Sequence, residues 1–258
     1  IITCLDDGNT AELEAGITLE ALVGDFNTAR GLTTGIVTIQ PESLLPYHRH
    51  PCGESVTVLE GEAEVSVEGR TYRLGPLDNI TIPRWLPHQT RNPDSSKATR
   101  LHVALAMSTP ERELVQTSFE QTDMPANASG TPGFEHVTRF ANAEHVQSNG
   151  PGTTYIDYFN TSLVPGIEMS GGFARIDPDV RLPDHLHDFD ESICIIRGDA
   201  ECLVEGRQYS LNNCATAMIP RGRVHYFTNQ SENQMEMIWV CGGPMPEPIP
   251  IAAGFVSD

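Results

Sequence analysis

Short stretches in which hydrophobic and polar residues alternate, separated by turn residues, run through the whole chain. Residues 34–40 and 63–67 alternate in this way, and Glu68-Gly69 is typical of a hairpin turn that leads into residues 70–74. Successive side chains of a strand point to opposite faces, so the pattern predicts short strands with one buried face. Many such strands at intervals of roughly ten residues, with Gly, Pro and Asp between them, predict an all-β sandwich or barrel of the jelly-roll type.

The two halves of the chain repeat one another. His48 and His185 lie 137 positions apart (185 − 48), and the same spacing relates His88 to His225. Turn and strand residues keep this spacing too, since the sequence Val-Glu-Gly-Arg at 67–70 returns at 204–207. Because the spacing holds without a gap, it indicates an internal duplication of a whole scaffold.

Each half contains three histidines and one glutamate in the same order. His48 and His50 are two residues apart, so on a strand both side chains point into the barrel while Arg49 points out. Glu54 follows across a turn, and we expect His88 on a strand that lies opposite. Imidazole and carboxylate groups suit divalent transition metals, and four ligands leave one or two positions open, as in a catalytic site. The predicted metal ligands are His48, His50, Glu54, His88, His185, His187, Glu191 and His225.

These residues resemble the two sequence motifs of the cupin family, and the chain is similar to a bicupin, which carries two cupin domains. The first motif, G-x5-H-x-H-x3,4-E-x6-G, is matched by each ligand set followed by Gly61 or Gly198. The second, G-x5-P-x-G-x2-H-x3-N, is matched by Pro83, His88 and Asn92 and, after its first position, by Pro220, Gly222, His225 and Asn229. The resemblance implies two tandem cupin β-barrels (double-stranded β-helix or jelly-roll domains) and up to two divalent transition metal ions per chain, with Fe, Mn, Ni, Co and Zn all compatible.

Five positions where the cupin motifs have glycine carry other residues. They are Glu42 and Asp179 in the first motif, Leu77 and Cys214 at the start of the second, and Trp85 inside the second motif of the first half only. These substitutions affect the expected turn geometry, whereas the metal ligands are complete.

The surroundings of the two predicted sites differ. Gly222 in the second half replaces Trp85, and at the common spacing Trp239 corresponds to His102, so we expect a large ring and a polar group at equivalent wall positions. We hypothesise that the two sites have unequal roles and that the second, with its intact Pro-x-Gly-x-x-His turn, performs catalysis.

Charge and cysteine content restrict the kinds of binding partner and the cellular compartment that we expect. A net charge of −19 argues against nucleic acid and anionic membranes as partners. We find no run of 18 apolar residues and no signal peptide pattern, and the six cysteines show no C-x-x-C spacing, so free thiols in the cytoplasm are expected. The partner is expected to be a small-molecule substrate, and a homo-oligomer is left open.

The repeat also predicts the division of the chain. We expect an N-terminal cupin domain over residues 1–117, a linker over 118–133 and a C-terminal cupin domain over 134–258 with a proline-rich tail. Residues 1–30 are expected to form one or two strands that lead into the barrels or pair across them.

The leading functional hypothesis is a metal-dependent enzyme acting on a small organic acid or an oxygenated ring compound, specifically a non-heme dioxygenase. The alternatives are a redox-neutral decarboxylase, lyase, isomerase or aminohydrolase, or a non-catalytic protein that binds a metal or small ligand. Arginine side chains could hold a substrate carboxylate through two parallel hydrogen bonds. The candidates for that role are Arg84, Arg91, Arg175, Arg221 and Arg223, while Cys52 is expected to be a small buried filler.

Overall fold

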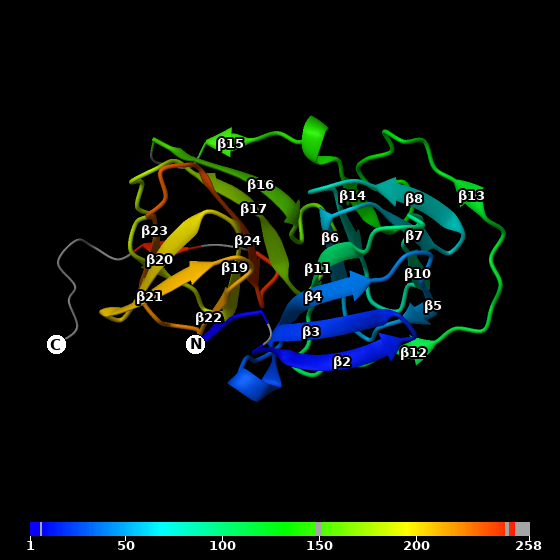
Figure 1. Cartoon of the computed structure of the whole chain (residues 1–258), viewed down its shortest axis with the longest axis horizontal. Helices are drawn as coiled ribbons and strands as arrows, with labels where there is room; N and C mark the ends of the chain where they lie inside the picture. The colour runs from blue at the N-terminus through cyan, green and yellow to red at the C-terminus, as the bar shows by residue number, and fades with distance from the viewer. Residues whose placement is uncertain (6, 148–150, 246–247, 251–258) are drawn as a thin grey trace.

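The structure, a computed structural model, describes residues 1–5, 7–147, 151–245 and 248–250. In these residues 25 strands form four sheets, and the only helices are two short 3₁₀ turns, Asp25–Asn27 and Phe140–Asn142. The sheets form two jelly-roll barrels side by side, in agreement with the predicted fold class (Figure 1). No helix in the described part of the chain has the length and apolar character that crossing a membrane requires.

The first barrel consists of a seven-stranded and a six-stranded sheet. The seven-stranded sheet has the order β14 (His136–Thr138), β9 (Asn79–Ile82), β6 (Glu54–Glu60), β11 (Thr99–Leu105), β4 (Thr33–Ile39), β3 (Ile17–Val23) and β2 (Asn9–Glu14). The six-stranded sheet has the order β12 (Glu113–Leu114), β5 (Leu44–Arg49), β10 (His88–Arg91), β7 (Ala63–Val67), β8 (Arg70–Leu74) and β13 (Thr122–Asp123).

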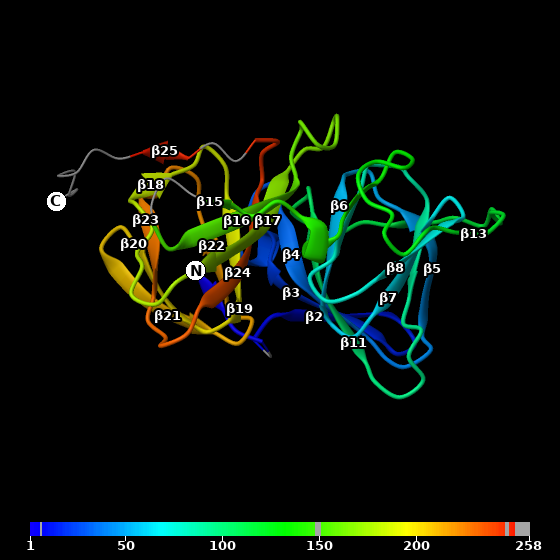
Figure 2. The same ribbon diagram turned by 90° about the horizontal axis from the view of Figure 1, so that it is seen from above.

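The second barrel repeats this arrangement. Its seven-stranded sheet has the order β1 (Ile2–Thr3), β22 (Thr216–Ile219), β19 (Glu191–Arg197), β24 (Met235–Cys241), β17 (Ser170–Ile176), β16 (Thr153–Phe159) and β15 (Val146–Gln147). The five-stranded sheet has the order β21 (Arg207–Asn212), β20 (Asp199–Val204), β23 (His225–Asn229), β18 (His185–Leu186) and β25 (Ile249–Pro250). Figure 2 shows β25, part of the proline-rich tail, beside β18 at the outer edge; Pro246 and Glu247 of that tail lie outside the described residues.

Strands cross between the two barrels in both directions. β1, at the start of the chain, pairs with β22 in the second barrel through Ile2 and Ala217. β14, which follows the predicted linker, pairs with β9 in the first barrel through Val137 and Ile80. The described part of residues 1–30 thus forms three strands rather than the one or two expected: β1 pairs across the barrels, while β2 and β3 lead into the first. The exact domain boundaries stay a prediction.

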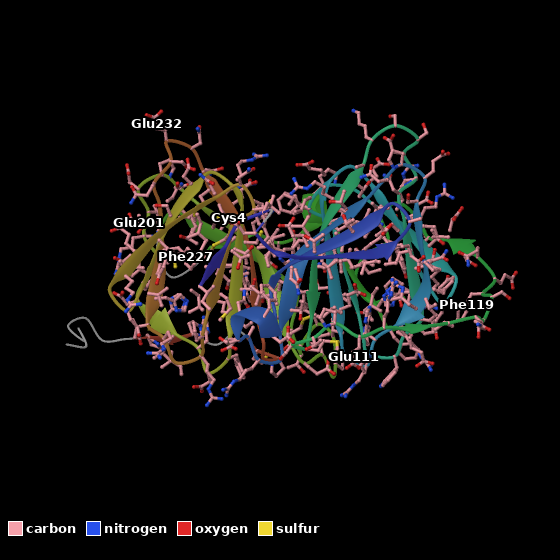
Figure 3. The ribbon with its side chains drawn as sticks, turned by 60° about the horizontal axis from the view of Figure 1, so that its bottom comes forward. Cys4, Glu111, Phe119, Glu201, Phe227 and Glu232 are labelled. Atoms are coloured by element: carbon pink, nitrogen blue, oxygen red, sulfur yellow. The ribbon has the colours of Figure 1, made fainter. Side chains whose placement is uncertain are left out.

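Hydrophobic side chains form three cores. One fills the first barrel, with Tyr72 and Ile80 fully buried, and one fills the second, around Ile195 and Phe227. Figure 3 shows Phe227 within the second barrel, while Glu232 reaches the surface. The third core lies between the barrels and joins residues of both, including Leu32 and Ala104 from the first and Ile156, Phe173 and Ile238 from the second. This shared core fixes the two barrels against each other.

The turns that lack the motif glycines keep the geometry that glycine would favour. All five residues have left-handed backbone, with φ of 59° at Glu42 and Asp179, 64° at Leu77, 63° at Trp85 and 65° at Cys214. The loops that carry the ligands therefore have the same shape in both repeats despite the substitutions.

Candidate metal centres

Each barrel brings its four predicted ligands together. In the first, His48 lies on β5, Glu54 begins β6 and His88 begins β10. The ligating atoms of these three residues and of His50 all lie within 4.8 Å of one another. In the second, His185 on β18, His187, Glu191 on β19 and His225 on β23 meet the same limit. We expected the third histidine of each set on a strand across the barrel from the first. It lies instead on the neighbouring strand, because His88 pairs directly with His48 and His225 with His185.

Hydrogen bonds to the backbone orient the imidazole rings. Nδ1 of His48 lies 2.8 Å from the carbonyl oxygen of Pro46, and Nδ1 of His88 lies 2.9 Å from that of Leu86. A carbonyl can only accept, so each Nδ1 carries the proton and each Nε2 keeps a free lone pair. The second site repeats these contacts from His185 to Pro183 (2.8 Å) and from His225 to Arg223 (2.9 Å).

The atoms at the centre of each group fit a cation. Nε2 of His88 lies 2.7 Å from Oε2 of Glu54, yet both atoms are buried and form no hydrogen bond with suitable geometry. His225 and Glu191 show the same relation at 2.8 Å. Buried polar atoms without partners are costly, and acceptor atoms that converge in this way are stabilised by a shared metal ion. These two sets are therefore suited to hold a divalent transition metal, whose element the ligand types alone leave open.

In each set the carboxylate and its nearest imidazole shift one another's pKa. Burial acts to lower the pKa of His88, but Glu54 outweighs it and raises that pKa, as Glu191 does for His225, and a bound metal would displace that proton. Burial lowers the pKa of His48 to about 3, so its ring is neutral at pH 7. Burial acts to raise the pKa of Glu54, but the positive charge that His88 and His50 can carry outweighs it and lowers that pKa to about 2. The pKa of Glu191 falls to about 2 for the same combination of reasons, with His225 as its main neighbour. Ionised carboxylates and neutral imidazoles are the forms that ligate metals.

Nδ1 of the second histidine in each set, His50 or His187, has different surroundings in the two sites. Nδ1 of His50 donates to the carbonyl oxygen of Glu111, which lies on the segment that returns to the barrel after β11. Nδ1 of His187 is buried and has no hydrogen-bond partner in the described part of the chain. The contact to Glu111 leaves no sequence motif, because every residue has a backbone carbonyl. Sequence reasoning therefore missed it.

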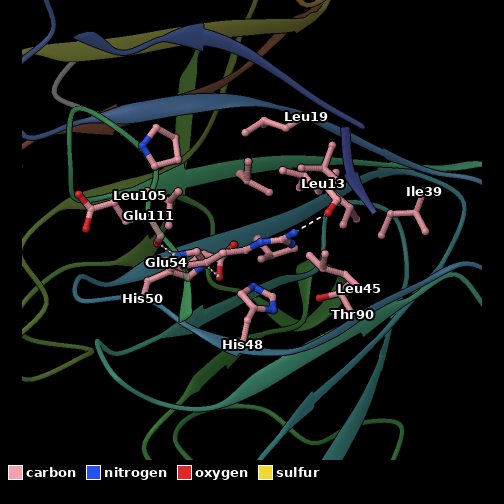
Figure 4. A pocket seen from close by; sticks show the side chains of 16 residues that line it. Leu13, Leu19, Ile39, Leu45, His48, His50, Glu54, Thr90, Leu105 and Glu111 are labelled. Atoms are coloured by element: carbon pink, nitrogen blue, oxygen red, sulfur yellow. Dashed lines mark hydrogen bonds and ion pairs between the residues drawn. The ribbon is translucent and has the colours of Figure 1, made fainter. Parts of the chain in front are cut away.

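A cavity opens onto each group of ligands. The first has a volume of about 150 Å³ and is lined mainly by aliphatic side chains, among them Leu13, Leu19 and Ile39 (Figure 4). The second has a volume of about 400 Å³ and is lined by more polar and aromatic residues, including Tyr155, Asp157 and Trp239. The first therefore suits a small apolar group and the second a larger polar molecule.

The arginine that reaches a metal centre is not among those expected. None of Arg84, Arg91, Arg175, Arg221 and Arg223 lines either metal cavity. Arg84 pairs with Glu168 and Arg175 with Glu236, for example. Arg112 instead lines the first cavity, with Nη2 donating to the carbonyl oxygen of Leu13. Cys52 is buried as expected, and burial raises the pKa of its thiol to about 12.

The expected match between His102 and Trp239 is wrong. Leu105 pairs with Glu54 and Cys241 with Glu191, so β11 and β24 correspond at a spacing of 136 residues (241 − 105). The preceding loop is one residue longer in the first half: Asn92 Nδ2 bonds to the carbonyl of Lys97, but Asn229 Nδ2 to that of Asn233. Because a shift by one residue moves a side chain to the other face of a strand, Trp239 faces its cavity like Val103, while His102 faces away from the first cavity.

One wall strand accounts for much of the difference between the cavities. Ala174 pairs with Tyr155 on β16, as Val37 pairs with Leu19 on β3, so these strands are equivalent. At the inward-facing positions, Thr153, Tyr155 and Asp157 of the second barrel replace Ile17, Leu19 and Ala21 of the first. The sequence does show the polar alternation of β16, but without the fold nothing relates it to the ligands.

Comparison with known proteins places this arrangement in a family. The sequence pattern of the cupin domain matches residues 35–104 and 172–241. Over 50 residues the chain is 46% identical to the dimethylsulfoniopropionate lyase of Ruegeria pomeroyi, and over 61 residues 36% identical to a 5-nitrosalicylic acid 1,2-dioxygenase of Bradyrhizobium sp.. These matches cover 19% and 24% of this chain and span only 25% and 30% of the lengths of the two relatives.

Solved structures share the fold over almost the whole chain. The oxalate decarboxylase of Lactobacillus farciminis aligns with 97% of this chain and 88% of its own, at a TM-score of 0.78 and 14% identity. The oxalate decarboxylase of Bacillus subtilis aligns with 97% of this chain and 78% of its own, at a TM-score of 0.75 and 14% identity. At this identity the likeness concerns the fold alone. With two complete ligand sets in two equivalent barrels, the chain belongs to the cupin family and is a bicupin.

Proposed function

We propose that this bicupin is a metal-dependent enzyme that acts on a small organic acid, and that the second barrel is its reaction chamber. One observation carries the proposal: the second cavity combines a complete ligand set with a polar wall formed by Thr153, Tyr155 and Asp157. Hydroxyl and carboxylate groups orient a polar substrate and exchange protons with it, whereas the equivalent positions of the first barrel, Ile17, Leu19 and Ala21, offer neither.

The reaction class that fits this chamber best is redox-neutral, a lyase or decarboxylase. A metal bound by His185, His187, Glu191 and His225 would act as a Lewis acid toward a substrate oxygen. Phe227, Trp239 and Met237 line the chamber and limit the access of water, which strengthens electrostatic interactions inside. The lyase among the similar proteins supports this class.

A dioxygenase is the second candidate, and the first cavity favours it. Its volume of about 150 Å³ and its aliphatic lining suit a small ring, and Arg112 lies at its wall to meet a carboxylate. The match to a dioxygenase that acts on a ring acid agrees with this assignment.

An oxygen electrode and product analysis separate the two candidates. The protein, purified without chelator, is assayed with oxalate, dimethylsulfoniopropionate and 5-nitrosalicylate, alongside His48→Ala and His185→Ala. We expect turnover of an acid without oxygen uptake, reduced roughly a hundredfold or more by His185→Ala, because loss of a ligand impairs the metal centre. His48→Ala should retain most of the activity. Oxygen uptake that matches product and disappears in His48→Ala would instead identify the dioxygenase of the first barrel.

A further inference from the structure

A row of paired residues on the wall of the second cavity places a carboxylate close to an aromatic ring. Asp157 on β16 pairs with Gly172 on β17, and Gly172 pairs with Trp239 on β24. Paired residues on neighbouring strands point to the same face, and both Asp157 and Trp239 line the cavity. Only a glycine separates them within this row.

Gly172 provides the space for the ring. A Cβ atom at this position would lie 3.0 Å from Cζ2 of Trp239 and 2.0 Å from the carbonyl oxygen of Ile156. The indole therefore extends from β24 over the glycine, toward the strand that carries Asp157. Tyr155 lies two residues before Asp157 on the same face, so the carboxylate has aromatic residues on two sides.

Among the residues that the structure describes, no Lys or Arg forms an ion pair with Asp157. Its one hydrogen bond to a side chain in the described part of the chain comes from Asn160, with Nδ2 3.3 Å from Oδ2, and the cavity lining includes neither Lys nor Arg. The other carboxylate of the cavity, Glu191, faces His187 and His225 and belongs to the metal-binding group. Partial burial raises the pKa of Asp157, in agreement with a carboxylate that lacks a counter-charge.

The first cavity has no such arrangement. The positions equivalent to Asp157, Gly172 and Trp239 are Ala21, Gly35 and Val103, which provide neither a carboxylate nor a ring. Its charged wall residues outside the ligands are instead Glu111 and Arg112, and Nη1 of Arg112 is buried without a partner among the residues described. The first cavity thus has an arginine in its wall, whereas the second places a carboxylate beside an aromatic ring.

We infer that Asp157, Trp239 and Tyr155 bind the positively charged group of a small organic cation, specifically an alkylated onium group such as quaternary ammonium or sulfonium. Aromatic faces attract such groups through the ring quadrupole, and a carboxylate adds direct charge attraction without needing an N–H donor. The cavity volume of about 400 Å³ accommodates a trimethylated head together with a short chain. This inference rests on the proposed function for one further step: the acid group of the same substrate faces the metal ligands, so the substrate is a zwitterion.

Tryptophan fluorescence provides a direct test because the chain has only two tryptophans and Trp85 is exposed. In a Trp85→Phe background, the signal of Trp239 is followed during titration with choline and with its neutral isostere 3,3-dimethylbutan-1-ol. We expect saturable binding of choline, about tenfold or more tighter than the isostere. Asp157→Asn, which preserves the side-chain shape, should weaken choline about tenfold and leave the isostere unchanged. Asp188→Asn makes the same charge change at an exposed position and serves as the matched control.

Several results would overturn the inference. They are equal affinity for choline and the isostere, no saturable choline binding, or an Asp157→Asn variant that folds with an unchanged thermal midpoint and still prefers choline. Methylammonium binding more tightly than tetramethylammonium would indicate a hydrogen-bonding amine site instead. The same preference measured by calorimetry should be lost in Trp239→Leu. These readouts require no turnover, so onium binding without lyase activity would refute the proposed reaction alone.

Discussion

The backbone at the five substituted turn positions is left-handed although none of these residues is glycine. For an L-residue with a Cβ atom, this conformation costs roughly 1–2 kcal/mol. Glu42 and Asp179, both with φ of 59°, are exposed, so their side chains contribute little packing to offset that cost. The turn shape follows from the strands on either side, which require it whatever residue stands there.

Glycine at position 42 should therefore stabilise the protein. We expect Glu42→Gly to raise the free energy of unfolding by about 0.5–1 kcal/mol, since relief of the strain exceeds the larger entropy of glycine in the unfolded chain. Glu42→Ala keeps the Cβ atom and should bring no such gain. Equilibrium denaturation in urea compares the two, and equal effects would show that charge or solvation, rather than backbone strain, governs the site.

At the scale of strands, a single loop residue decides which side chains reach a cavity. The sequence was sufficient to predict most of the central strands, the two barrels and the grouping of the eight candidate ligands, because the H-x-H-x3-E spacing and its repeat carry that information. It was not sufficient to place Trp239, Asp157 or Arg112, because their positions depend on strand register and on segments that return to the barrel. The assignment of these eight residues as metal ligands stays a prediction. Measurement of the metal content per chain can test it.

The same register places His102 in the contact region between the barrels, on the face that also carries Ala104. It is 3% exposed, and burial lowers its pKa to about 4 from an ordinary value of 6.5. Between these values the unfolded chain binds a proton that the folded chain does not, so stability falls as the pH decreases from about 6.5 and levels off below about 4.

Replacement of His102 should remove this part of the pH dependence. We expect the free energy of unfolding of His102→Leu, relative to wild type, to rise by roughly 2–3 kcal/mol between pH 7 and pH 4. Chemical denaturation of both proteins, at the same metal loading, over this range provides the comparison. A constant difference at all pH values would mean that the ring is protonated, or accessible to water, in the folded state.

Across the whole molecule, each barrel supports the ligand loop of the other. Asp190, next to the predicted ligand Glu191, accepts hydrogen bonds from the backbone N–H of Arg221 at 2.8 Å and of Arg30, in the first repeat, at 2.7 Å. At the equivalent position of the first loop, the N–H of Gly53 lies 3.2 Å from Oε2 of Glu168. The two centres are therefore parts of one rigid assembly rather than independent sites in linked domains.

Removal of the Asp190 carboxylate should weaken both the fold and the second centre. We expect Asp190→Ala to lower the free energy of unfolding by about 2–4 kcal/mol, because two partly buried hydrogen bonds to a charged acceptor are lost. The metal content attributable to the second barrel should fall as well, measured by mass spectrometry in a His48→Ala background. Asp188→Ala is the control, since that side chain is exposed in the same segment. Equal stability of the two variants would contradict the bracing role of Asp190.

The exchange of strands has a consequence for how the chain is made. Ile2 pairs with Ala217, so β1 is synthesised well before its partner strand and can pair only after the intervening residues have been made. The first barrel, by contrast, already has its β14 once residues 136–138 have emerged. Contacts between such distant positions are slow to form because the intervening loop must first close. The nascent first barrel must therefore keep β1 free for pairing, and completion of the second barrel then joins β1 to β22.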